Sequence, residues 1–128
     1  MILLDTHAWL WLISDPARLS GAARAAVDAA ERLGVCTISC WELGMLAQSG
    51  RIRIDREPRA WMRQALADQR TEAIPLSAET ALSAALLPVS FPGDPADRII
   101  FATAVDHGIR LVTRDERMSA YDPSRTIW

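Results

Sequence analysis

The sequence predicts an α/β fold in which four to five strands form a central parallel sheet that is covered by helices. Short apolar runs alternate with longer amphipathic stretches, which is the pattern of repeated strand–helix–strand units. Half of the 128 residues are hydrophobic, enough to build a sizeable core. We therefore expect one domain that spans residues 1–128.

The strand candidates are short runs rich in Leu, Ile and Val that are bounded by polar or turn-forming residues. In chain order these runs lie at 2–4, 35–39, 72–76 and 110–113, with an edge strand at 126–128.

Six stretches between the strand candidates have helical spacing of their apolar residues. They lie at 6–14, 20–33, 40–48, 58–69, 77–86 and 95–107. Asp94 and Pro95 predict an N-cap followed by proline at the first helical position. Ser39 and Glu42 have the spacing of a capping box, and the alternation at 51–54 predicts a short extended piece.

Four acidic residues follow a predicted strand or begin a predicted helix: Asp5, Glu42, Asp97 and Asp115. Helix capping would explain each of them singly. In a parallel sheet, however, such junctions gather at the edge formed by the carboxyl ends of the strands. Carboxylates that converge there repel one another, and Mg²⁺ or Mn²⁺ would offset that repulsion. The sequence therefore predicts a divalent cation site.

Charge and composition exclude several other chemistries. All 14 basic residues are arginine, so a Schiff-base lysine, a phosphate-binding lysine and a phosphoacceptor receiver domain are excluded. The residue two positions after Asp5 is His7, so the Asp-x-Asp of a haloacid-dehalogenase phosphatase is absent. The formal charge of −2 predicts no overall attraction to nucleic acid. We expect Cys36 and Cys40 to be reduced thiols in a cytoplasmic protein without a membrane span.

Four short motifs occur in order along the chain, and together they resemble the PIN domain family. They are Leu3-Leu4-Asp5-Thr6-His7, Ser39-x-x-Glu42, Asp94-Pro95-Ala96-Asp97-Arg98 and Leu111-Val112-Thr113-Arg114-Asp115. The set looks specifically like the VapC-type ribonuclease toxins of bacterial type II toxin–antitoxin pairs, and it covers essentially the whole chain.

The resemblance implies a three-layer α/β/α fold and a Mg²⁺- or Mn²⁺-dependent endoribonuclease that a VapB-like antitoxin inhibits. Asp5, Glu42 and Asp97 match the main acidic cluster of the family, and Asp115 matches its more variable fourth acid. Asp94 matches a further recurring acid, which we interpret as a helix cap. Metal-assisted hydrolysis would leave a 5′-phosphate and a 3′-hydroxyl on the RNA products.

Other residues match or flank these motifs. Thr6 and Thr113 match hydroxyl positions near the acidic cluster, whereas Pro92 and Gly93 stand where many relatives have His or Arg. The candidate RNA contacts are seven arginines. Five lie in the basic stretch 51–63, namely Arg51, Arg53, Arg56, Arg59 and Arg63, and two lie beside the acids in sequence, namely Arg98 and Arg114. A solvated helix face explains the spacing of three of these arginines equally well.

Two further expectations concern assembly and activity. Apolar helical surfaces, which include tryptophans at helical spacing, predict self-association as a homodimer. The alternative to the nuclease is a catalytically silent PIN-like module that binds RNA or a protein. Such a module would be expected to have lost one or more of the four acids, and all four are present in this chain.

Overall fold

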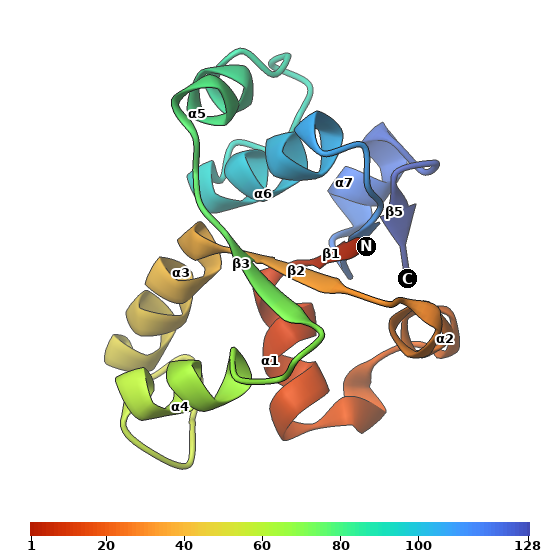
Figure 1. Cartoon of the computed structure of the whole chain (residues 1–128). Coiled ribbons are helices and arrows are strands. Elements are labelled where there is room, and N and C mark those ends of the chain that lie inside the picture. Colours follow the sequence, from red (N-terminus) through yellow and green to blue (C-terminus); the bar gives the residue numbers. More distant parts are fainter.

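A five-stranded parallel sheet runs through the middle of the molecule (Figure 1). The computed structural model describes residues 1–128. The strands are β1 (Ile2–Leu4), β2 (Leu33–Cys36), β3 (Thr71–Ile74), β4 (Leu111–Val112) and β5 (Thr126–Ile127). Their order is β3-β2-β1-β4-β5, and each neighbouring pair is parallel. The prediction of an α/β fold with a central parallel sheet is confirmed.

Helices cover both faces of the sheet and give three layers (Figure 1). One face carries α1 (Thr6–Ser14), α2 (Gly21–Ala29), α3 (Thr37–Gln48) and α4 (Pro58–Ala65), with a short 3₁₀ turn, η1 (Pro16–Arg18), after α1. The other face carries α5 (Ala78–Ala85), α6 (Pro95–Asp106) and α7 (Glu116–Tyr121). None of these helices has the length and apolar character needed to cross a bilayer.

The alternation of side chains along the strands divides the hydrophobic core into two clusters. Leu4 and Val112 belong to the cluster beneath α1, α2 and α4, which also contains Trp9 and Trp61. The residues before them, Leu3 and Leu111, belong to the cluster beneath α6 and α7. Because β1 and β4 are buried on both faces, their positions in the fold are tightly constrained.

The chain reverses its direction across the sheet next to β1. It passes from β1 to β2 and β3 on one side, then returns through α5 and α6 to β4 on the other side. In open parallel sheets, such a reversal opens a crevice at the carboxyl ends of the two central strands. Asp5 follows β1 and Thr113 follows β4, so both residues lie at this crevice.

The predicted start of α3 is wrong. The helix begins at Thr37 with Cys36 as its N-cap, so Ser39 lies inside the helix and forms no capping box with Glu42. The Ser39 hydroxyl is fully buried and instead accepts a hydrogen bond of 2.9 Å from the Thr6 hydroxyl. A contact between residues distant in sequence therefore takes the place of the local cap.

Three other boundaries differ from the sequence predictions. The helix predicted at 20–33 ends at Ala29, because Leu33 is buried and pairs within the sheet as the first residue of β2. Residues 51–54 form no strand, because Gly50 at φ +75° ends α3 and the backbone N–H of Arg51 returns to the Leu46 carbonyl. Helix α7, which Asp115 caps, is absent from the sequence predictions.

Candidate active site

A cavity of about 940 Å³ opens at the carboxyl ends of β1 and β4. Seven acidic residues line it, and five of them come from the sequence motifs at distant parts of the chain: Asp5, Glu42, Asp94, Asp97 and Asp115. Asp5 follows β1, Glu42 projects from α3, Asp94 and Asp97 start α6, and Asp115 starts α7. The fold therefore brings together all four acids that the sequence singled out, along with Asp94.

Asp5 is the most buried of these acids, with 8% of its surface exposed. Its carboxylate accepts a hydrogen bond of 2.8 Å from the Ala8 backbone N–H, which caps α1, and a further hydrogen bond from the Thr113 hydroxyl. Burial nevertheless raises the pKa of Asp5, and the nearby Glu42 carboxylate raises it further. A neighbouring cation would favour the charged form of this group.

Glu42, Asp94 and Asp97 form a compact group of oxygen ligands. One carboxylate oxygen from each lies within 4.8 Å of the other two. Carboxylate oxygens gathered in this way suit a hard divalent cation such as Mg²⁺ or Mn²⁺. Asp94 also caps α6 through a 3.0 Å hydrogen bond from the Asp97 N–H. Its interpretation as a helix cap is therefore confirmed, but the same residue also belongs to the acidic group.

Asp97 lies at the electrostatic centre of the cluster. Burial raises its pKa to about 7, and the charges of the four other acids act in the same direction, with Asp94 contributing most among them. A carboxylate with this pKa is held in its charged form only at a cost. The repulsion among these carboxylates is only partly offset by the surrounding side chains. A bound cation would neutralise the rest, so the donor set fits a cation.

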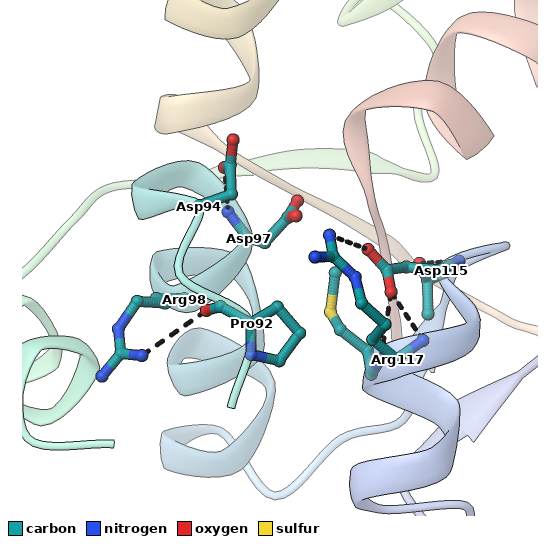
Figure 2. A network of polar contacts seen from close by, with 8 residues as sticks. Pro92, Asp94, Asp97, Arg98, Asp115 and Arg117 are labelled. Carbon is teal, nitrogen blue, oxygen red and sulfur yellow. Dashed lines mark hydrogen bonds and ion pairs between the residues drawn. The ribbon is translucent and has the colours of Figure 1, made fainter. Parts of the chain in front are cut away.

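Asp115 is held by local contacts at the start of α7 (Figure 2). Its Oδ1 atom accepts hydrogen bonds from the backbone N–H groups of Arg117 and Met118, and its Oδ2 atom forms an ion pair of 3.7 Å with the Arg117 guanidinium. In Figure 2 the Asp97 carboxylate points toward Asp115 and Arg117. Arg117 thus offsets part of the negative charge at this margin of the cavity.

The two predicted hydroxyls make different contacts. Thr113 is fully buried, hydrogen-bonds to the Asp5 carboxylate, and accepts a hydrogen bond of 3.0 Å from the Asp115 backbone N–H. It therefore connects two of the acids directly. Thr6 donates to Ser39, joining the first turn of α1 to that of α3, and so acts on the orientation of Asp5 and Glu42 indirectly.

The predicted RNA-contacting arginines lie in different parts of the structure. Arg51, Arg53 and Arg114 line the acidic cavity. Arg56 pairs with Asp55 and lines a second cavity of about 690 Å³, which shares Ser14 and Arg53 with the first. Arg59 pairs with Glu57, and neither Arg59 nor Arg63 lines either cavity.

Arg98 lies beside Asp97 in sequence, but its side chain points in another direction. Its guanidinium donates to the backbone carbonyls of Ala84, Ala85, Leu87 and Pro92, and Figure 2 shows the bond to Pro92. These bonds fasten the start of α6 to the end of α5 and to the loop that follows it. The structure therefore gives Arg98 a role in anchoring this loop, at a distance from the crevice that Asp97 faces.

Three other lining residues, His7, Trp11 and Arg18, were missed by sequence reasoning. The sequence gives His7 no role beyond its place in the first motif, and Trp11 lies in an apolar helical run that predicts packing. Arg18 is isolated in sequence from every motif. Its proximity to the acids follows from the 3₁₀ turn that folds back after α1, which no local pattern predicts.

Comparisons with known proteins match the chain over nearly its whole length. A model of the PIN domain matches residues 2–123. The chain is 43% identical over 129 residues to Ribonuclease VapC22 of Mycobacterium tuberculosis, and the alignment covers 99% of this chain and 98% of that relative.

Two solved structures share the fold at low sequence identity. A toxin–antitoxin complex from Klebsiella pneumoniae contains a chain with a TM-score of 0.72 and 23% identity, covering 100% of this chain and 97% of that one. VapBC2 from Rickettsia felis, bound to a DNA fragment from its promoter, gives a TM-score of 0.70 and 16% identity, with coverage of 98% and 97%.

Replacing Asp97 by Asn should stabilise the metal-free protein at neutral and alkaline pH. The folded-state pKa of Asp97 is raised to about 7, so the folded protein tolerates the protonated carboxyl group and is destabilised by the charged one. Relative to a group with an ordinary pKa near 4, the folded state therefore loses stability as the pH rises from about 4 through 7. With EDTA present, Asp97→Asn should raise Tm above pH 7 by about 4 °C per kcal/mol gained, and the gain should shrink toward pH 4. Thermal unfolding across pH measures this difference.

The matched control for that measurement is Asp28→Asn. Asp28 lies on α2 with 68% of its side chain exposed, and its only ion pair is the one to Arg24. This control should leave the pH profile of Tm close to that of the wild type. A wild-type profile for Asp97→Asn as well would contradict the proposed electrostatic cost.

Replacing Thr113 by Val removes the hydroxyl that connects Asp5 to Asp115 while preserving the shape of the side chain. The Asp115 backbone N–H loses its acceptor, and the buried Asp5 carboxylate keeps only the Ala8 N–H as a donor, so we expect a loss of about 1–3 kcal/mol in the free energy of unfolding. Denaturant unfolding measures the loss. Thr103→Val is the matched control, because the Thr103 hydroxyl donates to the Ile99 carbonyl of its own helix. Equal losses for both variants would reject the connecting role.

Proposed function

The chain belongs to the PIN domain family, and from this premise we propose that it is a metal-dependent endoribonuclease of the VapC type, the toxin of a toxin–antitoxin pair. The observation that carries the proposal is the convergence of five carboxylates at the carboxyl ends of β1 and β4. The same chain is 43% identical, over nearly its full length, to a relative named as a ribonuclease.

We propose that Asp5, Glu42, Asp97 and Asp115 are the catalytic carboxylates, and that Asp94 assists them. Glu42, Asp94 and Asp97 offer the most compact set of oxygens and would hold a Mg²⁺ or Mn²⁺ ion. Such a cation, when bound, would supply an activated water for attack on a phosphodiester and would stabilise the negative charge of the transition state. The buried Asp5, which directly follows β1, would add a further negative charge beside this cation.

The residues of the chain itself position the reacting groups. Thr113 holds the Asp5 carboxylate, and the start of α1 fixes it a second time through the Ala8 N–H. Asp115 is anchored by the first turn of α7 and partly neutralised by Arg117, so one of its oxygens can orient a water molecule. Because these contacts exist before substrate binds, little rearrangement is needed for reaction.

Asp97 links the chemistry to pH. Without a cation its pKa of about 7 leaves much of the carboxyl group protonated at neutral pH. Only the ionised Asp97 carboxylate would hold a cation, so cation binding would weaken as the pH falls below 7. The activity of the enzyme should follow the same dependence.

The proposed partners follow from the same comparisons and from the surface. The toxin–antitoxin complex from Klebsiella pneumoniae and VapBC2 from Rickettsia felis, which share the fold, support a VapB-like antitoxin as a partner of this chain. We also propose a homodimer. Trp41 and Met45 lie one turn apart on α3 with 56% and 52% of their surfaces exposed, an apolar pair that a second copy would cover.

RNA cleavage with Mn²⁺, Mg²⁺ or EDTA tests the proposed reaction. Wild type should cut single-stranded RNA with either cation and not with EDTA, leaving 5′-phosphate ends. Asp5→Asn and Asp97→Asn should each lose at least about 100-fold in rate, because outer contacts of metal sites already contribute 10–100-fold. Asn remains a good N-cap, so Asp5→Asn should stay folded.

Asp28→Asn, which changes one exposed acid on α2 in the same way, should cleave at the wild-type rate. Undiminished, cation-dependent cleavage by folded Asp5→Asn or Asp97→Asn would reject the assignment of these residues. A wild-type protein that binds RNA with either cation and does not cut it would instead support a catalytically silent PIN-like module.

The homodimer is tested by light scattering coupled to gel filtration. Wild type should have the mass of two chains, and the double variant Trp41→Ser Met45→Ser should shift toward one chain because its exposed apolar face is removed. Leu82→Ser Leu86→Ser changes an exposed residue of α5 and its exposed C-cap residue, so it removes a similar apolar pair elsewhere and serves as the control. A monomeric wild type would refute the homodimer, and dissociation of the control alone would place the interface at α5.

A further inference from the structure

The arginines of this chain divide into those that the protein pairs internally and those that it leaves free. Nine have an ion pair or a side-chain hydrogen bond: Arg24, Arg32, Arg56, Arg59, Arg70, Arg98, Arg110, Arg117 and Arg125. The other five have neither: Arg18, Arg51, Arg53, Arg63 and Arg114. Four of these five line the acidic cavity, and only Arg63 does not.

This distribution is unexpected on electrostatic grounds. Seven acidic residues line the same cavity, so four free guanidinium groups have carboxylates close at hand. Opposite charges at such a site would normally pair and satisfy their hydrogen bonds. Since no ion pair forms between these arginines and the acids, their donor groups remain available to an anion that enters the cavity.

Arg18 and Arg114 are held in place without using their hydrogen-bond donors. Both guanidinium groups lie against the ring of Trp11, with the Cζ atom 4.5 Å from the ring centroid for Arg18 and 5.8 Å for Arg114. A cation–π contact involves the face of the guanidinium and leaves its N–H groups directed outward at the edge. The two side chains are therefore oriented in advance for bidentate contact with phosphate.

Trp11 is a firm support for them. Its surface is 93% buried, with 7% exposed, and its ring also contacts Trp128 at 5.8 Å and His7 at 5.6 Å between centroids. Arg18 comes from η1 and Arg114 from the segment after β4, so residues far apart in sequence converge on one ring. A convergence of this kind, with free donors facing an acidic cavity, has no counterpart elsewhere in the chain.

We propose that Arg18 and Arg114, supported by Trp11, are positioning residues that hold the backbone phosphates of single-stranded RNA next to the scissile one. This inference rests on the proposed ribonuclease function and names how that site holds its substrate. Arg51 and Arg53 reach the same cavity from the segment after α3 and provide further cationic contacts. The arginines offset the repulsion between the RNA backbone and the acidic residues, while the acids remain free for a cation.

Binding of a fluorescent single-stranded oligoribonucleotide, measured by anisotropy at several NaCl concentrations, tests the proposal. The measurement uses Asp97→Asn protein as the background, so that the RNA is not cut. Adding Arg18→Gln Arg114→Gln should weaken binding several-fold or more and reduce the slope of log K against log salt by about 1.4, which is about 0.7 for each lost phosphate contact. Arg18→Lys Arg114→Lys, which keeps both charges, should restore most of that slope.

Arg24→Gln Arg32→Gln is the matched control, because it removes two exposed positive charges that are paired with acids outside the cavity. It should retain nearly the full slope. If the Arg18→Gln Arg114→Gln protein matches this control in affinity and slope, the positioning role is refuted. All measurements are made well below the Tm of each variant, and a Gln variant that does not fold is replaced by the single variants Arg18→Gln and Arg114→Gln.

The binding experiment does not depend on catalysis. Failure of the wild-type protein to cleave RNA with Mn²⁺ would reject the proposed function even if the salt slope changes as expected. Conversely, normal cleavage by the wild type together with an unchanged slope for the Gln variants would reject only the role of Arg18 and Arg114.

Discussion

The burial of β1 between β2 and β4 is the constraint on which the rest of the structure depends. This three-residue strand is covered on both faces by separate core clusters, so neither its register nor its direction can shift without exposing Leu3 or Leu4. Asp5 follows immediately and is thereby fixed at the edge where the chain changes direction across the sheet. The other carboxylates are arranged around a position that the core has already determined.

Three of the five acids also serve as helix caps, and this double use reconciles the cluster with a stable fold. Asp5, Asp94 and Asp115 accept backbone N–H groups at the starts of α1, α6 and α7. The positive ends of these helix dipoles partly compensate the gathered negative charge. Compensation remains incomplete at Asp97, whose pKa stays raised to about 7 by burial and by its neighbours. The charge that is left uncompensated is what makes the site attractive to a cation.

The sequence predicts those parts of the structure that are governed by local patterns. Apolar runs with strand character and the Asp94–Pro95 cap identify β1 and α6 to the residue or nearly so. Sequence patterns fail to predict the role of a residue whose main contact is distant in sequence. Ser39, for example, does not form the expected capping box and instead accepts a hydrogen bond from Thr6. Asp5, Asp97 and Asp115 are found from sequence because they stand at element boundaries, whereas Glu42 lies in the second turn of α3. Arg18 is missed because its neighbour in space, Trp11, is separated from it by a turn.

The contrast among the arginines shows why charge patterns alone do not locate a binding surface. Arg56, Arg59 and Arg63 share a helical spacing in sequence, yet two of them are paired locally, and local pairing lowers the gain from a new contact with phosphate. Arg18 and Arg114 share no pattern, yet both rest on one buried ring with their donors unused. What identifies a cation as available to substrate is therefore the absence of an internal partner at a site where acidic partners are plentiful. That condition is a property of the folded molecule.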